Sequence, residues 1–260
     1  MTSYQPRTWL ELHDLLFADS WQDRLKRHRS HLAFRGMPDA AAPLATRLSL
    51  QNPGTERHLL RNFRKFARSN SVPGDSVWNW LALAQHHGLP TRLLDWTFSP
   101  YVALHFATDD PARFGEDGAI WCIDYVAAHR HLPRRLRKML DDESADVFTA
   151  EMLARAAETL DDFDRLARDP FLLFMDPPSL DERIVNQFAL FSLLSGPSIR
   201  LEDWIERRPD LARRIVLPAS LKWEVRDKLD QANITERVLF PGLDGLSRWL
   251  ARYYTPRGEG

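Results

Sequence analysis

A short block near the middle of the chain is rich in residue types that can do chemistry. It covers residues 85–96 and reads QHHGLPTRLLDW. Adjacent histidines at a helix end cannot both face a core, and we select His87 for acid–base work because histidine changes charge near neutral pH. Asp95 adds a carboxylate and Arg92 a guanidinium for ligand binding. Because these two are three residues apart, an ion pair that locks the loop between them is the structural alternative.

A second candidate is the pair Arg35 and Gly36, at the end of a short strand predicted over residues 30–36. An arginine can bind a phosphate with two parallel hydrogen bonds, and a neighbouring glycine lets a ligand approach the backbone closely. A structural ion pair of Arg35 with Asp95 or Asp244 is the alternative.

The residues after Asp95 alternate between aromatic and hydroxyl side chains. Trp96 and Phe98 alternate with Thr97 and Ser99, which is typical of an aromatic wall beside hydroxyl groups in a ring-binding pocket. Core packing of the two rings, with Ser99 as the N-cap of a helix that begins at Pro100, explains the same pattern.

Several kinds of chemistry are disfavoured. The sequence has no GxGxxG or GxxxxGK phosphate loop and no GxSxG nucleophile elbow. The histidines lack the HExxH spacing or paired cysteines of a metal site, so no metal is predicted. Cys122 lies in an apolar run and is predicted to be an inert core residue.

The elements that must position these residues are short strands among helices. Helical spacing or capping signals occur over residues 9–25, 59–67, 78–88, 99–107, 133–168, 222–232 and 245–254. Strand-like runs occur over residues 30–36, 118–125, 188–194 and 214–217. Because strands and helices do not alternate regularly, we predict a single compact α+β domain over residues 1–260, with a small mixed sheet surrounded by helices. The charged segment 133–168 is predicted to be a helical peripheral insertion.

Composition limits the function classes. The chain has 35 basic and 36 acidic residues and a formal charge of −1, so no global positive field attracts nucleic acid. Local basic runs at residues 24–29 and 134–138 keep nucleic-acid contact open, although such runs are usually solvated helix faces. A single cysteine and the lack of a long apolar run predict a cytoplasmic protein without membrane contact.

Several motifs together resemble the FRG domain family of bacterial and phage proteins, which occur in defence-like contexts. They are Phe34-Arg35-Gly36, the segments 43–48 and 97–107, the block 85–96, the strand 117–121, and the segments 183–191 and 239–246. The resemblance extends over residues 30–250, and the block 85–96 is its most specific part.

The order of the motifs also resembles, more weakly, an ADP-ribosyltransferase of the Arg–Ser–Glu type. That resemblance implies that Arg35 holds a dinucleotide, that the segment 95–99 supports the nicotinamide ribose, and that Gln187 occupies the place of the catalytic glutamate. NAD would be the substrate. Because a glutamine cannot act as a general base, another acid such as Asp95 or Glu182 must take that role, or the domain binds a nucleotide without turning it over.

Three functions therefore remain open. The first is an NAD-binding, ADP-ribosyltransferase-like activity in a defence or toxin setting, with a nucleic-acid or protein acceptor. The second is a nucleic-acid-binding or nuclease-like module. The third is a protein-interaction domain in which the block 85–96 is purely structural.

Overall fold

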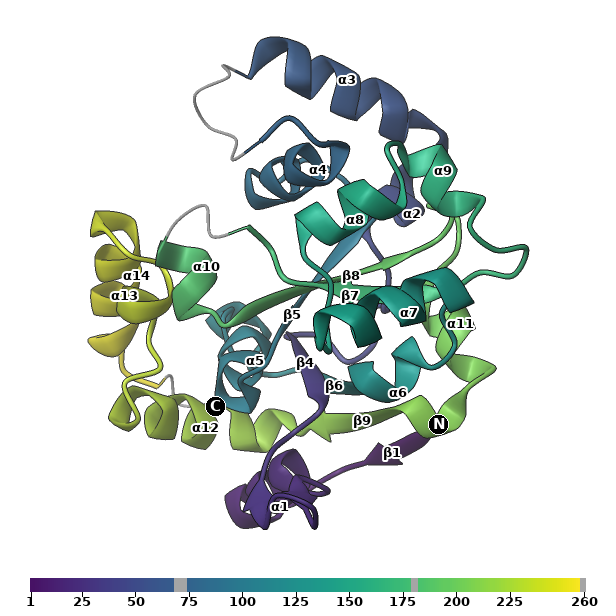
Figure 1. The fold of residues 1–260 in the computed structure, drawn as a ribbon. Helices are drawn as coiled ribbons and strands as arrows, with labels where there is room; N and C mark the ends of the chain where they lie inside the picture. Colours follow the sequence, from purple (N-terminus) through teal and green to yellow (C-terminus); the bar gives the residue numbers. More distant parts are fainter. Residues whose placement is uncertain (68–73, 179–181, 258–260) are drawn as a thin grey trace.

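A computed structural model describes residues 1–67, 74–178 and 182–257. Within these residues a sheet of seven strands crosses the molecule, with helices on both faces (Figure 1). The strand order is β1 (Thr2–Tyr4), β9 (Ala212–Leu217), β6 (Gly118–Asp124), β4 (Leu32–Met37), β5 (Leu93–Thr97), β8 (Ala189–Leu194) and β7 (Leu172–Met175). β1 is parallel to β9, and the other neighbours are antiparallel. This mixed sheet surrounded by helices confirms the predicted α+β class.

Strand β6 shows why the sheet is buried on both faces. Its residues from Gly118 to Ile123 are all buried, as expected for an apolar run in a central strand. Successive side chains point to opposite faces. Trp121 and Ile123 belong to one core cluster, and Ile120 and Cys122 to another. The predicted core position of Cys122 is thereby confirmed, and burial raises the pKa of its thiol to about 11.

The first face of the sheet is covered by two short helices. Apolar side chains of α6 (Tyr125–His129) and α11 (Leu201–Glu206) pack there against Trp121 and Ile123 of β6 and against inward-facing residues of β4, β5, β7 and β8. The cluster is continuous along the sheet, because all of these strands contribute to it.

The opposite face carries two separate clusters. One lies over β9, β6 and β4 and is covered by α1 (Trp9–Phe17), α5 (Pro100–Ala107) and α12 (Ala219–Gln231). The other lies over β5, β8 and β7 and is covered by α3 (Glu56–Phe66), α4 (Val77–His86), α7 (Arg134–Glu143), α8 (Ala150–Ala156) and α9 (Leu160–Asp164). The boundary between the clusters falls at the β4–β5 junction.

Local capping signals determine the two helices that flank this junction. Ser76 caps the start of α4 by accepting a hydrogen bond from the backbone NH of Asn79. The helix ends at His86, and the chain reverses at Gly88, whose φ of 81° favours glycine. Ser99 caps α5, with Pro100 in its first turn. The predicted end of α4 at Gly88 and the predicted start of α5 at Ser99–Pro100 are confirmed.

The remaining elements are short. Helices α10 (Glu182–Asn186), α13 (Glu236–Leu239) and α14 (Leu243–Tyr253) lie together at one side of the molecule (Figure 1). A Cβ on Gly245 would lie 1.8 Å from the carbonyl oxygen of Phe240, so α14 can fold back on α13 only with glycine there. Helix α2 (Arg47–Gln51) follows β4. Single 3-10 turns occur at Pro53–Thr55, Pro111–Arg113 and Pro209–Leu211.

Two sequence predictions are wrong in detail. The helix predicted over residues 9–25 ends at Phe17, because Asp19 adopts a left-handed φ of 60° and β2 (Trp21–Gln22) then pairs with β3 (Arg27–His28) as a hairpin. The predicted loop between Arg92 and Asp95 belongs to strand β5, which pairs with β8.

The segment 133–168, which the sequence predicts as a peripheral insertion, forms α7, α8 and α9. Their apolar side chains belong to the cluster over β5, β8 and β7, where Leu136, Phe148 and Phe163 are fully buried. These helices therefore form part of the wall that supports β5.

Candidate functional site

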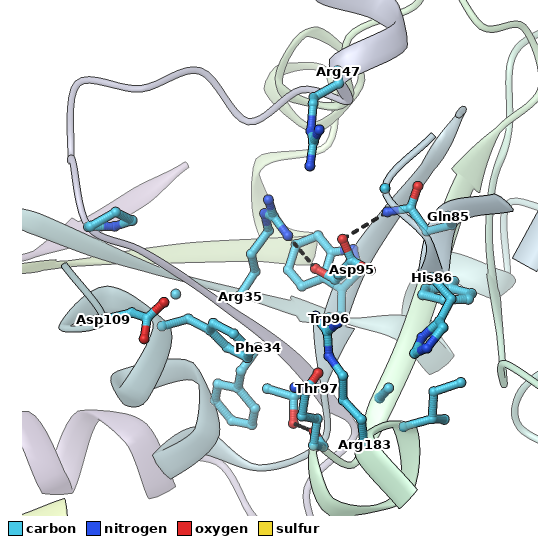
Figure 2. A pocket seen from close by; sticks show the side chains of 18 of the residues that line it. Phe34, Arg35, Arg47, Gln85, His86, Asp95, Trp96, Thr97, Asp109 and Arg183 are labelled. Atoms are coloured by element: carbon cyan, nitrogen blue, oxygen red, sulfur yellow. Dashed lines mark hydrogen bonds between the residues drawn. The ribbon is translucent and has the colours of Figure 1, made fainter. Parts of the chain in front are cut away.

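A cavity of about 640 Å³ opens on the face of the sheet at the β4–β5 junction. The two strands are in register there at the pair Phe34 and Thr97, whereas β4 pairs with β6 along its full length. Because β4 and β5 separate beyond this pair, side chains from both strands reach the same space (Figure 2). The ends of α4 and α5, and helix α10, complete its walls.

The cavity brings together most of the residues that the sequence predicts for a site. Those lining it are Arg35, Gly36, His87, Asp95, Trp96, Thr97 and Gln187. Arg92 and Ser99 lie outside it. The convergence of Arg35, Asp95 and Gln187 on one cavity is the arrangement expected if the separated motifs form a common site.

Arg35 enters the cavity from β4 with few partners of its own. Its side chain is partly buried, and Nη1 donates a hydrogen bond of 2.7 Å to the backbone carbonyl of Asp95. Its buried Nε has no partner within the described residues. Burial lowers the pKa of Arg35, and the negative charge of Asp95 opposes that shift. The carboxylates of Asp95 and Asp244 form no ion pair with Arg35 among the described residues, so the structure does not show the ion pair that was the structural alternative.

The carboxylate of Asp95 is held in place by the rest of its own block. Gln85 Nε2 donates to Asp95 Oδ2 at 2.9 Å, and the Thr91 hydroxyl donates to Gln85 Oε1 at 2.6 Å. Asp95 itself is exposed to the cavity. The turn between α4 and β5 thus sets the orientation of one carboxylate, whose second oxygen, Oδ1, forms no hydrogen bond with any described residue.

Thr97, Gln187 and Ser99 form a chain of hydrogen bonds that ties β5 to its neighbours. The Thr97 hydroxyl donates to the backbone carbonyl of Gln187 at 2.7 Å and accepts from the backbone NH of Ser99 at 3.0 Å. Gln187 Nε2 donates to the carbonyl of Leu239 at 3.0 Å. Ser99 caps α5 and does not line the cavity. These contacts give each of the three residues a structural role.

Gly36 and Trp96 also contribute to packing. A Cβ on Gly36 would lie 1.7 Å from the carbonyl oxygen of Ala103, so glycine lets α5 lie directly on β4. Trp96 is 3% exposed, and its Nε1 donates to the buried hydroxyl of Ser192 at 2.8 Å. Its ring belongs to the core, as in the packing alternative, and Phe98 likewise packs against Tyr125.

Arg92 pairs with residues far from the block. Its guanidinium contacts Glu56 on α3 and Asp164 on α9, each at 2.6 Å, and Arg92 is only 4% exposed. Burial acts to lower the pKa of Arg92, but hydrogen bonds and charges of the two carboxylates outweigh it and raise the pKa. The Arg92–Asp95 pair is therefore not formed, because Arg92, directly before β5, uses its guanidinium to pair with Glu56 on α3 and Asp164 on α9.

The two histidines lie at the end of α4, and both line the cavity. His87 is exposed, whereas His86 is half-buried. Their rings meet edge to face, with centroids 5.2 Å apart. His87 therefore stands at the rim, where its imidazole is open to solvent and to the cavity.

Sequence reasoning missed some residues that line the cavity. They are Gln85, Arg47, Asp109 and Arg183. Gln85 and Arg47 both lie within motifs that resemble the family, and this was the available signal. Asp109 contacts the fully buried His105 at 3.3 Å, and Arg183 lies over the ring of Phe240 at 5.0 Å.

The described residues offer neither a metal-binding cluster nor a membrane-spanning helix. No group of three or more His, Cys, Asp or Glu side chains in residues 1–67, 74–178 and 182–257 is placed to hold a metal ion. Across the same ranges, no helix combines the length and apolar character that crossing a bilayer requires. The basic runs 24–29 and 134–138 lie at the β2–β3 hairpin and on α7, and their residues do not line the cavity.

Comparison with known proteins gives a family match for the part of the chain that builds most of this cavity. Curated proteins and solved structures gave no match. Residues 30–116 match the family model of the FRG domain. That range contains β4, α2, α4, β5 and α5, whereas α10 and β8 lie beyond it. The chain therefore contains an FRG domain, which carries Arg35, Arg47 and Asp95.

Proposed function

We propose that the chain binds a dinucleotide of the NAD type in the cavity and acts on the bond between nicotinamide and ribose, as an ADP-ribosyltransferase does. The observation that carries the proposal is the convergence of Arg35, Asp95 and Gln187 on one cavity, although they are far apart in the sequence. Its volume of about 640 Å³ lies within the range of small-molecule sites.

Arg35 is the residue that binds the pyrophosphate in this proposal. Most of its donors are not used by the protein, and guanidinium groups suit bidentate contact with phosphate oxygens. Phe106 and Ile184 line another part of the same cavity and offer apolar contact for a ring. The cavity thus provides a cationic part and an apolar part, as a nucleotide requires.

Asp95 is the carboxylate that acts on the glycosidic bond. When the bond from ribose C1′ to the nicotinamide nitrogen breaks, both electrons leave with nicotinamide and positive charge develops on the ribose. An oriented carboxylate stabilises that charge. Water or an acceptor nucleophile then bonds to C1′ and gives up its proton. His87, exposed at the rim, is placed to receive it.

Gln187 and Thr97 act as positioning residues in this scheme. A glutamine side chain cannot take up the proton, and the amide nitrogen of Gln187 is already bonded to Leu239. Thr97 joins the backbone of Gln187 to β5 and so keeps α10 beside Asp95. Their replacement should reduce turnover by moving the cavity walls.

The test is thermal unfolding of the purified chain with and without millimolar NAD. A ligand at a hundredfold excess over its Kd stabilises the folded state by about 2.7 kcal/mol, so the wild type should melt at a higher temperature with NAD. Arg35→Met should lose this shift, whereas Arg61→Ala, an exposed arginine of α3 outside the cavity, should keep it. Release of nicotinamide, followed by chromatography, should fall in Asp95→Asn.

Other outcomes would favour the remaining functions. Binding to single-stranded nucleic acid that weakens steeply with added salt, together with no response to NAD, would replace our proposal with the nucleic-acid function. No response in either assay would favour a protein-interaction domain.

A further inference from the structure

Two arginines with nearly buried side chains, Arg92 and Arg252, are each matched by two carboxylates. Arg92 contacts Glu56 and Asp164, and Arg252 contacts Asp230 and Glu236 at 2.6 and 2.5 Å. The fully buried Arg226 instead lies 4.0 Å from one carboxylate, Asp230, and bonds to His105 and to the carbonyl of Ile234. Removing a guanidinium from water is costly, and paired carboxylates offset that cost. Arg35 is also partly buried, but no carboxylate pairs with it among the described residues.

Three arginines that line the cavity have no carboxylate partner among the described residues. One of them, Arg183, lies over the ring of Phe240, and the other two are Arg35 and Arg47. Among the described residues, the side chain of Arg35 forms a hydrogen bond only with the carbonyl of Asp95. Arg47 makes no hydrogen bond or ion pair to any residue in the described ranges, and it lines the same cavity. In Figure 2 the guanidinium groups of Arg47 and Arg35 point toward one another, with Asp95 beside them.

The position of Arg47 is built into the fold. Leu44 and Leu48, on either side of it in the sequence, are 0% and 1% exposed and anchor the segment in the core. Thr46 accepts a hydrogen bond of 3.1 Å from the backbone NH of Ser49 and so fixes the start of α2. The exposed side chain of Arg47 is thereby directed into the cavity from the side opposite β4 (Figure 2).

We propose that Arg35 and Arg47 form a clamp that binds the phosphate groups of the ligand from two sides. Two guanidinium groups that face each other repel, and a phosphate between them replaces this repulsion with charge-assisted hydrogen bonds. The clamp deepens the proposed function and rests on it for the identity of the ligand as a dinucleotide. Arg47 is the new residue, and phosphate is the chemical group that it recognises.

The carboxylate of Asp95 does not replace such a ligand. One of its oxygens already accepts a hydrogen bond from Gln85, and neither Arg35 nor Arg47 forms an ion pair with it among the described residues. A single carboxylate also has only two oxygens in one plane. A diphosphate presents oxygens in several directions and can therefore engage both guanidinium groups at once.

The experiment is calorimetric titration of the full chain with inorganic pyrophosphate. Loss of one charge-assisted contact weakens binding by about tenfold to a hundredfold, which is the effect that we expect for Arg47→Ala. Arg61→Ala removes the same charge outside the cavity and should bind as the wild type does. Because Arg47 is exposed, its replacement should leave the melting temperature unchanged, which separates lost binding from lost folding.

Equal affinities of wild type and Arg47→Ala, no binding to the wild type, or an equal loss in Arg61→Ala would each overturn the clamp. A parallel titration with NAD separates the two proposals. If pyrophosphate binding depends on Arg47 and NAD does not bind, the result supports the clamp and contradicts the proposal that the ligand is a dinucleotide. NAD binding that Arg47→Ala leaves unchanged would keep the dinucleotide and reject the clamp.

Discussion

Arg92 and Arg35 come from two of the motifs that resemble the FRG family, but they differ in burial and in their hydrogen-bond partners. Arg92 is 4% exposed and joins β5 to α3 and α9 through Glu56 and Asp164. Arg35 is partly buried and has a single backbone carbonyl as its hydrogen-bond acceptor. The guanidinium of Arg92 is thus paired with carboxylates of the protein, whereas Arg35, which lines the cavity, keeps donors without a protein acceptor.

This difference separates structural residues from candidate functional ones more clearly than residue type does. Arg92 and Asp95 belong to the same block, yet Arg92 points into the core and Asp95 into the cavity. The block 85–96 therefore has a structural part and a part that lines the cavity. Its turn and Arg92 fix strand β5, and this fixed strand presents Asp95 beside Arg35.

The largest effect that we expect is the loss of stability in Arg92→Ala. Removing one partner of a buried ion network leaves uncompensated charge on Glu56 and Asp164 and costs about 3–5 kcal/mol in the free energy of unfolding. Denaturant unfolding followed by circular dichroism measures it.

Arg57→Ala is the matched control for this variant. Arg57 also lies on α3 and pairs with Asp161, but its side chain is 72% exposed, so solvent screens the pair and the loss should be much smaller. Equal losses in the two variants would contradict the structural role of Arg92.

A second prediction applies the same comparison to histidines. His129 is 4% exposed, accepts a hydrogen bond from the backbone NH of Phe174 at 2.8 Å and contacts the carbonyl of Asp146 at 2.9 Å. Burial lowers its pKa from 6.5 to about 4. Below pH 6.5 His129 takes up a proton in the unfolded chain but stays neutral in the folded chain. The free energy of unfolding therefore falls as the pH drops toward 4, by about 3 kcal/mol in total.

Chemical denaturation at several pH values between 7 and 4 measures this loss. His129→Gln removes the titrating group, so its stability should decrease less with pH than that of the wild type. His87→Gln changes an exposed histidine at the cavity rim and should follow the wild-type curve. Parallel curves for wild type and His129→Gln would show that His129 does not contribute.

Signals from neighbouring residues in the sequence were sufficient to predict much of the fold. The Ser99–Pro100 start of α5, the Gly88 turn after α4 and the apolar run of β6 all follow from neighbouring residues, and the structure confirms them. Two elements escaped prediction for physical reasons. The left-handed backbone at Asp19 leaves no clear mark in the sequence, and the exposed Asp95 interrupts the apolar pattern of β5.

Long-range pairing explains what sequence reasoning missed in the site. The partners of Arg92 are Glu56 and Asp164, which lie 36 and 72 residues away along the chain. Without the fold, the nearby Asp95 was the simpler choice. Arg47 was noted only as part of a motif, because nothing local indicates that α2 turns it toward Arg35. Family resemblance, by contrast, was enough to group Arg35 with Asp95 and Gln187.

Only a small change in stability is expected from Arg35→Met. Methionine keeps much of the length of the side chain and removes a charge whose burial the protein compensates only with a carbonyl. Replacing a poorly compensated charge with an apolar side chain is often neutral or stabilising, so the free energy of unfolding should stay within about 1 kcal/mol of the wild type, on the stabilising side. Arg92→Met leaves Glu56 and Asp164 without their partner and should lose several times more free energy of unfolding. If both variants lost the same stability in denaturant unfolding, Arg35 would be a structural residue like Arg92, and the contrast on which the cavity proposal depends would disappear.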